Sequence, residues 1–544
     1  MKANNFLLRN ICYFLFLTYF LVGIFIVDDF GISVDEEFHR YSGFYWLNYI
    51  LEFTDFNGLK TAVTLKLSQI GGHTLPNPKN FPFYGVTFDL PLAFLETLFD
   101  IEESKNYFLL RHYVNFIIFF ISSIFFYLIL KIRFKNNIII FLGILLYLSS
   151  PRIFGQSFYN NKDIIFLSLL TINFYFFFRV IDHKSIKNIF LFSIFSALTC
   201  ATRVVGIFIP IVFISVLFLT KNTRKDNLLS IFKIISIYLL LTAFFLYFFW
   251  PYLWSDPFSN LFYSLKTFSK YPATFQMLYN GAYIDSKFLP LSYLPVWMFI
   301  TIPLSILVLF FYGYLIFLRR LFKRILNIKE ETFFNDFWRG SNEKKDFLIF
   351  LCFNVIFFYI ILSNSDLYNG WRHLYFLHFF ISYISCLGIY LVVLKFKKFK
   401  FISIIIFFLI SLNYIDIIKF HPYQGSYFNL FNVKKNNYEI DYWGLAGVRF
   451  LEQILNDNKN KELIKIGVAS YLPLERSLKM IDKELSIRLK IVGQNYSNAD
   501  YIFNNNISEV NKFVDDKYNI PKDFKLVDEF SINGFIMYEM YKKI

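Results

Sequence analysis

Eleven long apolar runs constrain the fold of this chain more than any other feature. A helix that crosses the hydrocarbon core of a membrane needs roughly 20 mainly apolar residues, because each residue adds about 1.5 Å of length. The runs fall at residues 6–27, 107–130, 137–150, 163–181, 187–201, 204–220, 229–250, 293–318, 347–363, 374–394 and 401–419. We therefore expect a polytopic α-helical membrane protein with about eleven transmembrane helices, of which the third and fifth are short.

The composition agrees with this class. Of the 544 residues, 56% are hydrophobic and only 17% are charged, whereas an ordinary soluble domain has about 25% charged residues. This excludes a soluble enzyme, a disordered chain and a nucleic-acid-binding module, despite a net charge of +15. All four cysteines lie within apolar runs, which predicts buried thiols and neither a disulfide framework nor a metal site.

The positively charged residues indicate how the chain crosses the membrane. The first run is not followed by a small-residue cleavage site, so we predict an uncleaved anchor with a cytoplasmic N-terminus. Under the eleven-helix count, every positive cluster between runs then falls on the cytoplasmic side. The clusters are Lys131/Arg133/Lys135, Lys184/Lys187, Lys221/Arg224/Lys225, Arg319/Arg320/Lys323/Arg324 and Lys395/Lys397/Lys398/Lys400. We expect a multi-pass membrane protein with its C-terminus on the outer side.

The chain after residue 420 has a different pattern, because long apolar runs stop and polar residues interleave. Strands are predicted at 465–469, 487–492 and 500–503, a helical stretch near 474–484, and a hairpin turn at Asn533-Gly534. The predicted domains are therefore residues 1–420 in the membrane and residues 421–544 as a small extracytoplasmic α/β domain.

The first outer loop, residues 28–106, opens with the acidic motif Asp35-Glu36-Glu37, and His39 follows. One interpretation is structural, because Ser33 and Glu36 have the spacing of a capping box and helix N-termini favour acids. The other is catalytic, because a carboxylate beside the first run lies at the level of the lipid headgroups, where a base meets a lipid-carried substrate. Asp35 and His39 share a helix face, which is weak evidence for a metal site.

Further charged and aromatic side chains occur on the same predicted side. Arg203 interrupts two apolar runs, where an arginine either extends toward the headgroups or binds an anion, and a planar guanidinium suits phosphate. Asp163 either begins an exposed helix or supplies a second acid. The other residues that we single out are Arg152, Lys162, Trp371, Arg372, His373, His421 and Tyr423. Together they offer cations for a phosphate, aromatic rings for a sugar and a lipid, and a carboxylate base for an acceptor hydroxyl.

Six short motifs occur in a specific order along residues 6–450. They are Val34-Asp35-Glu36, Ser150-Pro151-Arg152 through Asp163, Ala201–Gly206, Trp250–Pro257, Gly370–Phe376 and His421–Gln424. In this order they resemble the GT-C superfamily of membrane glycosyltransferases. The closest likeness is to glycosyltransferase family 39, which contains the protein O-mannosyltransferases and is related to the lipid A aminoarabinose transferases. The chain differs from the eukaryotic O-mannosyltransferases in having a C-terminal α/β tail and no evident inserted MIR-type domain.

The resemblance implies a polyprenyl-phosphate sugar donor, inversion at the anomeric carbon, and a lipid, glycan or protein acceptor at the outer face of the inner membrane. The protein would then lie in a bacterial inner membrane, with its C-terminal domain in the periplasm. It also implies that Asp35 is the catalytic acid of the Asp-Glu pair, with Glu36 beside it, and that Asp163 is the second outer-loop acid. For the donor phosphate we expect Arg203, Arg372, Arg152 and Lys162. For the substrate lining we expect His39, His373, Trp371, His421 and Tyr423.

Two other functions compete with a transferase. A flippase or transporter for lipid-linked sugars would predict halves related by inverted-repeat hydropathy, and no such pairing is evident. An O-antigen polymerase or ligase would place its main functional loop later in the chain. The residues require no cofactor and leave a divalent metal open.

Overall fold

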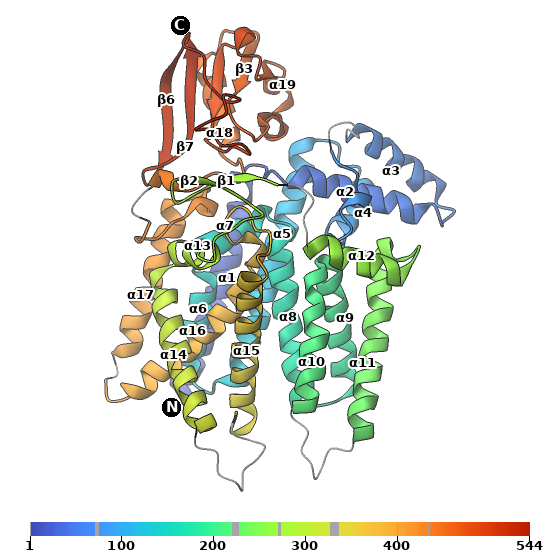
Figure 1. Ribbon diagram of the computed structural model, residues 1–544, viewed down its shortest axis with the longest axis vertical. Coiled ribbons are helices and arrows are strands. Elements are labelled where there is room, and N and C mark those ends of the chain that lie inside the picture. The colour runs from blue at the N-terminus through green and yellow to red at the C-terminus, as the bar shows by residue number, and fades with distance from the viewer. Residues whose placement is uncertain are drawn as a thin grey trace.

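Long helices form most of the computed structural model, and a small sheet lies at the end of the helices opposite the N-terminus (Figure 1). The structure describes residues 2–70, 75–219, 228–269, 274–326, 337–399, 401–432 and 435–544. The mainly helical class with a C-terminal sheet domain is as the sequence predicts.

The predicted apolar runs fold as helices. They are α1 (Lys2–Phe25), α5 (Ser104–Arg133), α6 (Asn137–Leu148), α8 (Asp163–Asp182), α9 (Ile186–Thr202), α10 (Phe208–Leu219), α11 (Leu228–Phe249), α13 (Tyr293–Thr301) with α14 (Leu304–Leu326), α15 (Gly340–Leu362), α16 (Leu377–Lys395) and α17 (Ile402–Lys419). Among the described residues, seven helices are long and apolar enough to cross a membrane, and an eighth results if α6 and the following α7 (Pro151–Tyr159), bent by 61°, count as one span. The protein is thus a multi-pass membrane protein, and the count of eleven stays a prediction.

Prolines mark two breaks between helices. Pro303 separates α13 from α14, and Ile302 before it is extended, because the residue before a proline disfavours the helical conformation. Pro151 begins α7 at a position where its missing N–H costs nothing. Both breaks place non-helical backbone near the end of the bundle that carries the sheet domain (Figure 1).

The other end of the bundle is held by ion pairs among the predicted positive clusters and nearby acids. Arg133 at the end of α5 makes two bonds of 2.7 Å to Asp346, and Arg324 at the end of α14 lies 2.8 Å from Glu343. Lys345, which is outside the predicted clusters, lies 2.7 Å from Asp182 at the end of α8. The N-terminus lies at this end (Figure 1). Four predicted cluster residues lie outside the described residues: Lys221, Arg224, Lys225 and Lys400.

The first outer loop folds into helices beside the sheet domain. These are α2 (Glu36–Leu51), α3 (Asn57–Gln69) and α4 (Asp89–Leu98). A buried charge network ties them to the spans: Arg40 and Arg111 both pair with Glu96, at 2.5 and 2.8 Å, and Lys162 pairs with Asp89 at 2.6 Å. Helix α12 (Pro257–Ser269) and the hairpin of β1 (Gln276–Tyr279) and β2 (Ala282–Asp285) lie at the same end (Figure 1).

The C-terminal domain contains one mixed five-stranded sheet in the order β4-β3-β5-β7-β6. Its elements are α18 (Gly447–Asp457), β3 (Ile464–Val468), α19 (Lys483–Ser486), β4 (Leu489–Gly493), β5 (Tyr501–Asn504), β6 (Phe524–Ile532) and β7 (Phe535–Lys543). The three predicted strands are confirmed within two residues. The hairpin turn is confirmed too, since Asn533 and Gly534 both have positive φ. The predicted helical stretch at 474–484 is instead a 3₁₀ helix, η9 (Leu474–Met480), followed by the single turn α19, because Ile481 between them is extended and buried.

Candidate functional site

Asp35 lies directly before α2 and pairs with Arg372. Its Oδ2 accepts a hydrogen bond from Arg372 Nη1 at 2.7 Å; the Asp35 side chain is 36% exposed and the arginine side chain only 4%. The guanidinium lies 4.7–5.0 Å from the ring centres of Tyr368, Tyr442 and Trp443. Aromatic faces attract a cation, so Arg372 is held in place while the carboxylate stays accessible.

A tight turn before Arg372 sets its position. Asn369 and Gly370 have φ values of +53° and +67°, and the Gly370 N–H donates to the Tyr293 hydroxyl at 3.0 Å. Trp371 is buried, and its indole N–H donates to the hydroxyl of Thr301 at 2.8 Å. Trp371 therefore anchors this turn to α13, and its role in lining a substrate stays a prediction. His373, also predicted to line the substrate, lies edge-on to Tyr368 with ring centres 4.5 Å apart.

Glu36 is buried and has two partners. Its Oε2 accepts the Ser33 N–H at 2.6 Å, and its Oε1 lies 2.7 Å from His112 Nε2 on α5. The contact with Ser33 is one half of the capping box that the spacing predicts. The structural interpretation therefore fits Glu36, whereas Asp35 makes no side-chain bond to the N-terminal backbone of α2.

Asp163 begins α8 and forms a buried ion pair with Arg203. Asn160 makes two hydrogen bonds to Asp163. Its side-chain amide donates to Asp163 Oδ2 at 2.9 Å, and its Oδ1 accepts the Asp163 N–H at 2.9 Å. The backbone of Arg203 is extended and forms an isolated antiparallel β-bridge with Tyr84. Gly85 is needed at this contact, because a Cβ there would lie 1.4 Å from the carbonyl oxygen of Ala201.

Three of the four predicted cations lie within electrostatic reach of His39. Burial lowers the pKa of the His39 imidazole well below its usual range, and the charges of Lys162, Arg203 and Arg372 lower it further. Both effects favour the neutral imidazole, and the three cations come from separate segments of the chain. Its Nδ1 has no hydrogen-bond partner among the described residues.

The three arginines predicted to bind phosphate each keep a guanidinium nitrogen with no hydrogen-bond partner among the described residues, as does Arg111, which pairs with Glu96. In the three predicted residues these atoms are Nη2 of Arg152, Nε of Arg203 and Nε of Arg372. Arg152 also has no acidic partner in the part of the chain that the structure describes; its Nε donates to the Tyr427 carbonyl at 2.8 Å, and Tyr375 accepts a further bond. A buried polar group without a partner costs about 1–3 kcal/mol and an unpaired charge costs more. A bound phosphate would offset both costs.

Tyr375 connects these groups. It is fully buried, it bonds to Arg152, and it lies within electrostatic reach of Asp163 and Arg372. The structure therefore brings Asp35, Asp163 and the predicted phosphate-binding cations to one region at the end of the bundle. They come from the segments before α2, around α7 and α8, after α9, and before α16.

Two of the residues that were predicted to line the substrate make their contacts outside this region. His421 pairs through Nε2 with Asp29 at 2.8 Å, and Tyr423 packs edge-on against Phe530 of the C-terminal sheet. Their predicted role in lining a substrate has no support from these contacts and stays a prediction.

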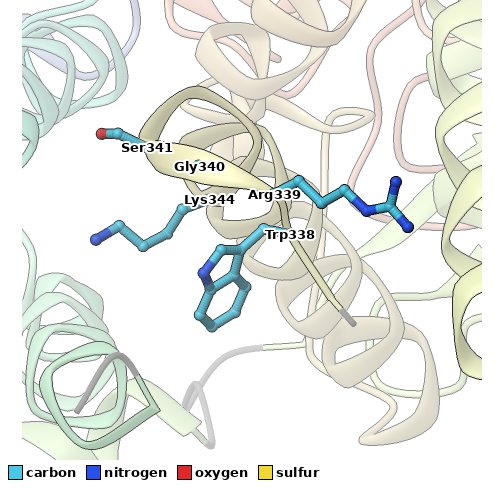
Figure 2. A pocket seen from close by; sticks show the side chains of 5 residues that line it. All are labelled: Trp338, Arg339, Gly340, Ser341 and Lys344. Atoms are coloured by element: carbon cyan, nitrogen blue, oxygen red, sulfur yellow. The ribbon is translucent and has the colours of Figure 1, made fainter. Parts of the chain in front are cut away.

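No group of three or more His, Cys, Asp or Glu side chains that could hold a metal ion occurs among the described residues. All four cysteines are buried and unpaired, as predicted. A surface hollow lined by Trp338, Arg339, Gly340, Ser341 and Lys344 (Figure 2) lies at the start of α15, at the opposite end of the bundle from Asp35.

The sequence interpretation missed several residues around Arg372. Tyr368, Tyr442 and Trp443 surround its guanidinium, and only the aromatic character of their segments pointed to them. Glu439 was missed entirely: it is buried, and burial raises the pKa of its carboxyl to about 8, although the Leu278 N–H and the charge of Arg372 act in the opposite direction.

Comparison with known proteins supports the predicted resemblance. Residues 98–254 match the family model described as dolichyl-phosphate-mannose-protein mannosyltransferase, which confirms the resemblance to this family over that part of the chain. No curated protein matches the sequence.

Several solved structures are similar at low identity. ArnT from Cupriavidus metallidurans bound to undecaprenyl phosphate is 10% identical, with 98% of each chain covered and a TM-score of 0.45. AglB from Archaeoglobus fulgidus, in complex with an inhibitory peptide and a dolichol-phosphate, is 11% identical, with 91% of this chain and 69% of that chain covered and a TM-score of 0.44. The Archaeoglobus fulgidus oligosaccharyltransferase with Zn and sulfate is 10% identical, with 90% and 67% covered and a TM-score of 0.44. The match to the family model, and not these scores, supports the function proposed below.

Proposed function

We propose that this protein is an inverting glycosyltransferase that moves a sugar from a polyprenyl-phosphate donor to an acceptor hydroxyl at the outer face of the inner membrane. The observation that carries the proposal is the set of buried guanidinium groups of Arg152, Arg203 and Arg372, each with an unpartnered nitrogen, of which Arg372 contacts the accessible carboxylate of Asp35. The match of residues 98–254 to a mannosyltransferase family supports the same reaction class.

The reaction is a single displacement. The acceptor oxygen attacks the anomeric carbon, the bond from that carbon to the phosphate oxygen breaks, and the acceptor proton passes to the Asp35 carboxylate. The leaving polyprenyl phosphate is stabilised by fixed cations, which need no reorganisation as charge develops. No step requires a metal.

Each neighbouring residue has a supporting role in this scheme. Arg372 contacts Asp35 directly, so one guanidinium aligns the base relative to the phosphate. Asp163 fixes the orientation of Arg203, and the neutral His39 offers its free Nδ1 to a hydroxyl or phosphate oxygen of the donor. Glu36 holds the turn before α2 through Ser33 and His112.

The acceptor in this proposal is a lipid, glycan or protein hydroxyl. The sheet domain and α2 share one end of the bundle (Figure 1), and we propose that this end is extracytoplasmic. The positive clusters at the other end, which include Arg133 and Arg324, support that orientation. We propose that residues 1–420 form the membrane domain and that residues 421–544 form the extracytoplasmic domain.

Mass spectrometry of lipid-linked sugars and cell-envelope glycoconjugates in a deletion strain tests the proposal. We expect a polyprenyl-phosphate sugar to accumulate and one glycoconjugate to lose a sugar, and we expect the wild-type gene to restore both pools. A variant with Arg152→Gln, which removes the unpaired cation, should fail to restore them. Unchanged pools in the deletion strain would contradict a transferase.

A further inference from the structure

The C-terminal domain contacts the turn that carries Asp35. Arg476 in η9 donates through Nη1 to the Val34 carbonyl at 2.5 Å and through Nε to Glu37 at 3.1 Å. Lys479, one turn further along, also pairs with Glu37. The side chains of Arg476 and Glu37 are only 20% and 14% exposed, so the contact is largely shielded from water.

A second contact reaches the same turn from the segment before α18. The Val34 N–H donates to the Trp443 carbonyl at 3.1 Å. The backbone around Trp443 is fixed in turn, because the Asp441 carboxylate accepts the N–H groups of Leu445 and Ala446 at 3.2 and 3.1 Å. Asn505, which follows β5, donates to the Asp441 carbonyl at 3.2 Å.

Both backbone hydrogen-bonding groups of Val34 are thus engaged by later parts of the chain: the N–H by Trp443 and the carbonyl by Arg476. Val34 directly precedes Asp35, so these two bonds set the backbone from which the Asp35 side chain extends. Arg476 also lies close enough to Asp35 for the two charges to interact.

We propose that Arg476 is a positioning residue, which holds the Asp35 carboxylate in the orientation needed for transfer and makes the C-terminal domain a part of the active site. This inference rests on the proposed transferase function. An arginine suits the task because its planar group donates in two directions at once, to Val34 and to Glu37, whereas a lysine has a single nitrogen. A displacement of about 1 Å in a reacting group costs on the order of 10²-fold in rate.

The test compares Arg476→Ala with two matched variants. Lys479→Ala removes the other partner of Glu37 but leaves the bond to the Val34 carbonyl, and Arg476→Lys keeps the charge but not the two-directional contact. Three quantities are measured: product formation in the deletion strain, binding of undecaprenyl phosphate to the purified full-length protein, and its thermal unfolding.

We expect Arg476→Ala to lower product formation at least tenfold while undecaprenyl phosphate affinity stays within twofold and the unfolding temperature is nearly unchanged. Lys479→Ala should retain product formation within threefold, and Arg476→Lys should fall between Arg476→Ala and the wild type. If Arg476→Ala is not recovered from membranes, Arg476→Gln, whose amide can reach only one of the two acceptors, is judged by the same criteria.

Product formation by Arg476→Ala within threefold of wild type would overturn the positioning role. A parallel loss of product formation, phosphate affinity and stability would overturn it too, because that result describes a structural contact. A wild-type protein that forms no product and binds no undecaprenyl phosphate would instead overturn the proposed function, so the two failures are distinguishable.

Discussion

Replacing Asp35 with asparagine separates catalysis from structure at the proposed active site. An asparagine oxygen can still accept the bond from Arg372 Nη1, which is 2.7 Å from the carboxylate. The Asp35 side chain is 36% exposed, so water reaches the pair, and the buried Arg372 keeps a hydrogen-bond acceptor in the variant. Asparagine cannot accept a proton at neutral pH, and a general base contributes on the order of 10²–10⁴-fold to the rate, or about 3–5 kcal/mol.

We therefore expect Asp35→Asn to lower turnover at least a hundredfold while undecaprenyl phosphate binding and folding are kept. Asp29→Asn is the matched control: Asp29 also precedes α2, its side chain is 53% exposed, and it pairs with His421 at 2.8 Å, outside the cluster of cations. Turnover is measured by mass spectrometry of the product in membranes of the deletion strain that carry equal amounts of each variant. Turnover of Asp35→Asn within threefold of wild type would refute the base assignment, and Asp163 would become the candidate.

Three further outcomes can be measured. Arg203→Lys and Arg372→Lys should each weaken undecaprenyl phosphate binding without loss of folding, because a lysine keeps the charge but loses the planar fork; unchanged affinity in both would leave these residues a structural role. Because burial raises the pKa of Glu439 from 4.5 to about 8, the folded protein retains a proton that the unfolded chain releases, and stability is lost as pH rises through about 8. Between about pH 5 and 9, the unfolding temperature of Glu439→Gln should therefore fall less steeply with pH than that of the wild type. Equal slopes for the variant and the wild type would contradict this prediction. A reporter fused after residue 544 should be active only outside the cytoplasm, and cytoplasmic activity would invert the proposed topology.

Much of the fold was predictable because it depends on local pattern. A helix in a membrane requires a long apolar run, so the runs located helices from α1 to α17 without tertiary information. The strands β3, β4 and β5 were readable from short β-prone segments. Charged residues at the ends of apolar runs stood out as candidates, because placing a charge near a membrane costs free energy and such charges are commonly functional. These residues are Asp35, Asp163, Arg203 and Arg372.

The pairing of those residues was not predictable from the sequence. Asp35 and Arg372 are 337 positions apart, and only the packing of α2 against the turn before α16 brings them together. The rings around Arg372 include Tyr442 and Trp443, which belong to a segment beyond the last span. Arg476 lies in a domain whose sequence carried no sign of a contact with the first outer loop.

The burial of the cations has a consequence for how the protein responds to its medium. Mobile ions screen charges that are separated by water over about 8–10 Å at ordinary salt concentrations, but they screen groups inside a protein much less. Arg152, Arg203 and Arg372 are each at most 4% exposed, so dissolved salt has little access to their guanidinium groups. A phosphate bound there would have nearly the same affinity at low and at high salt concentration. On the proposed extracytoplasmic side of the membrane, where the surroundings and not the cell set the ionic strength, this would keep binding of the donor constant.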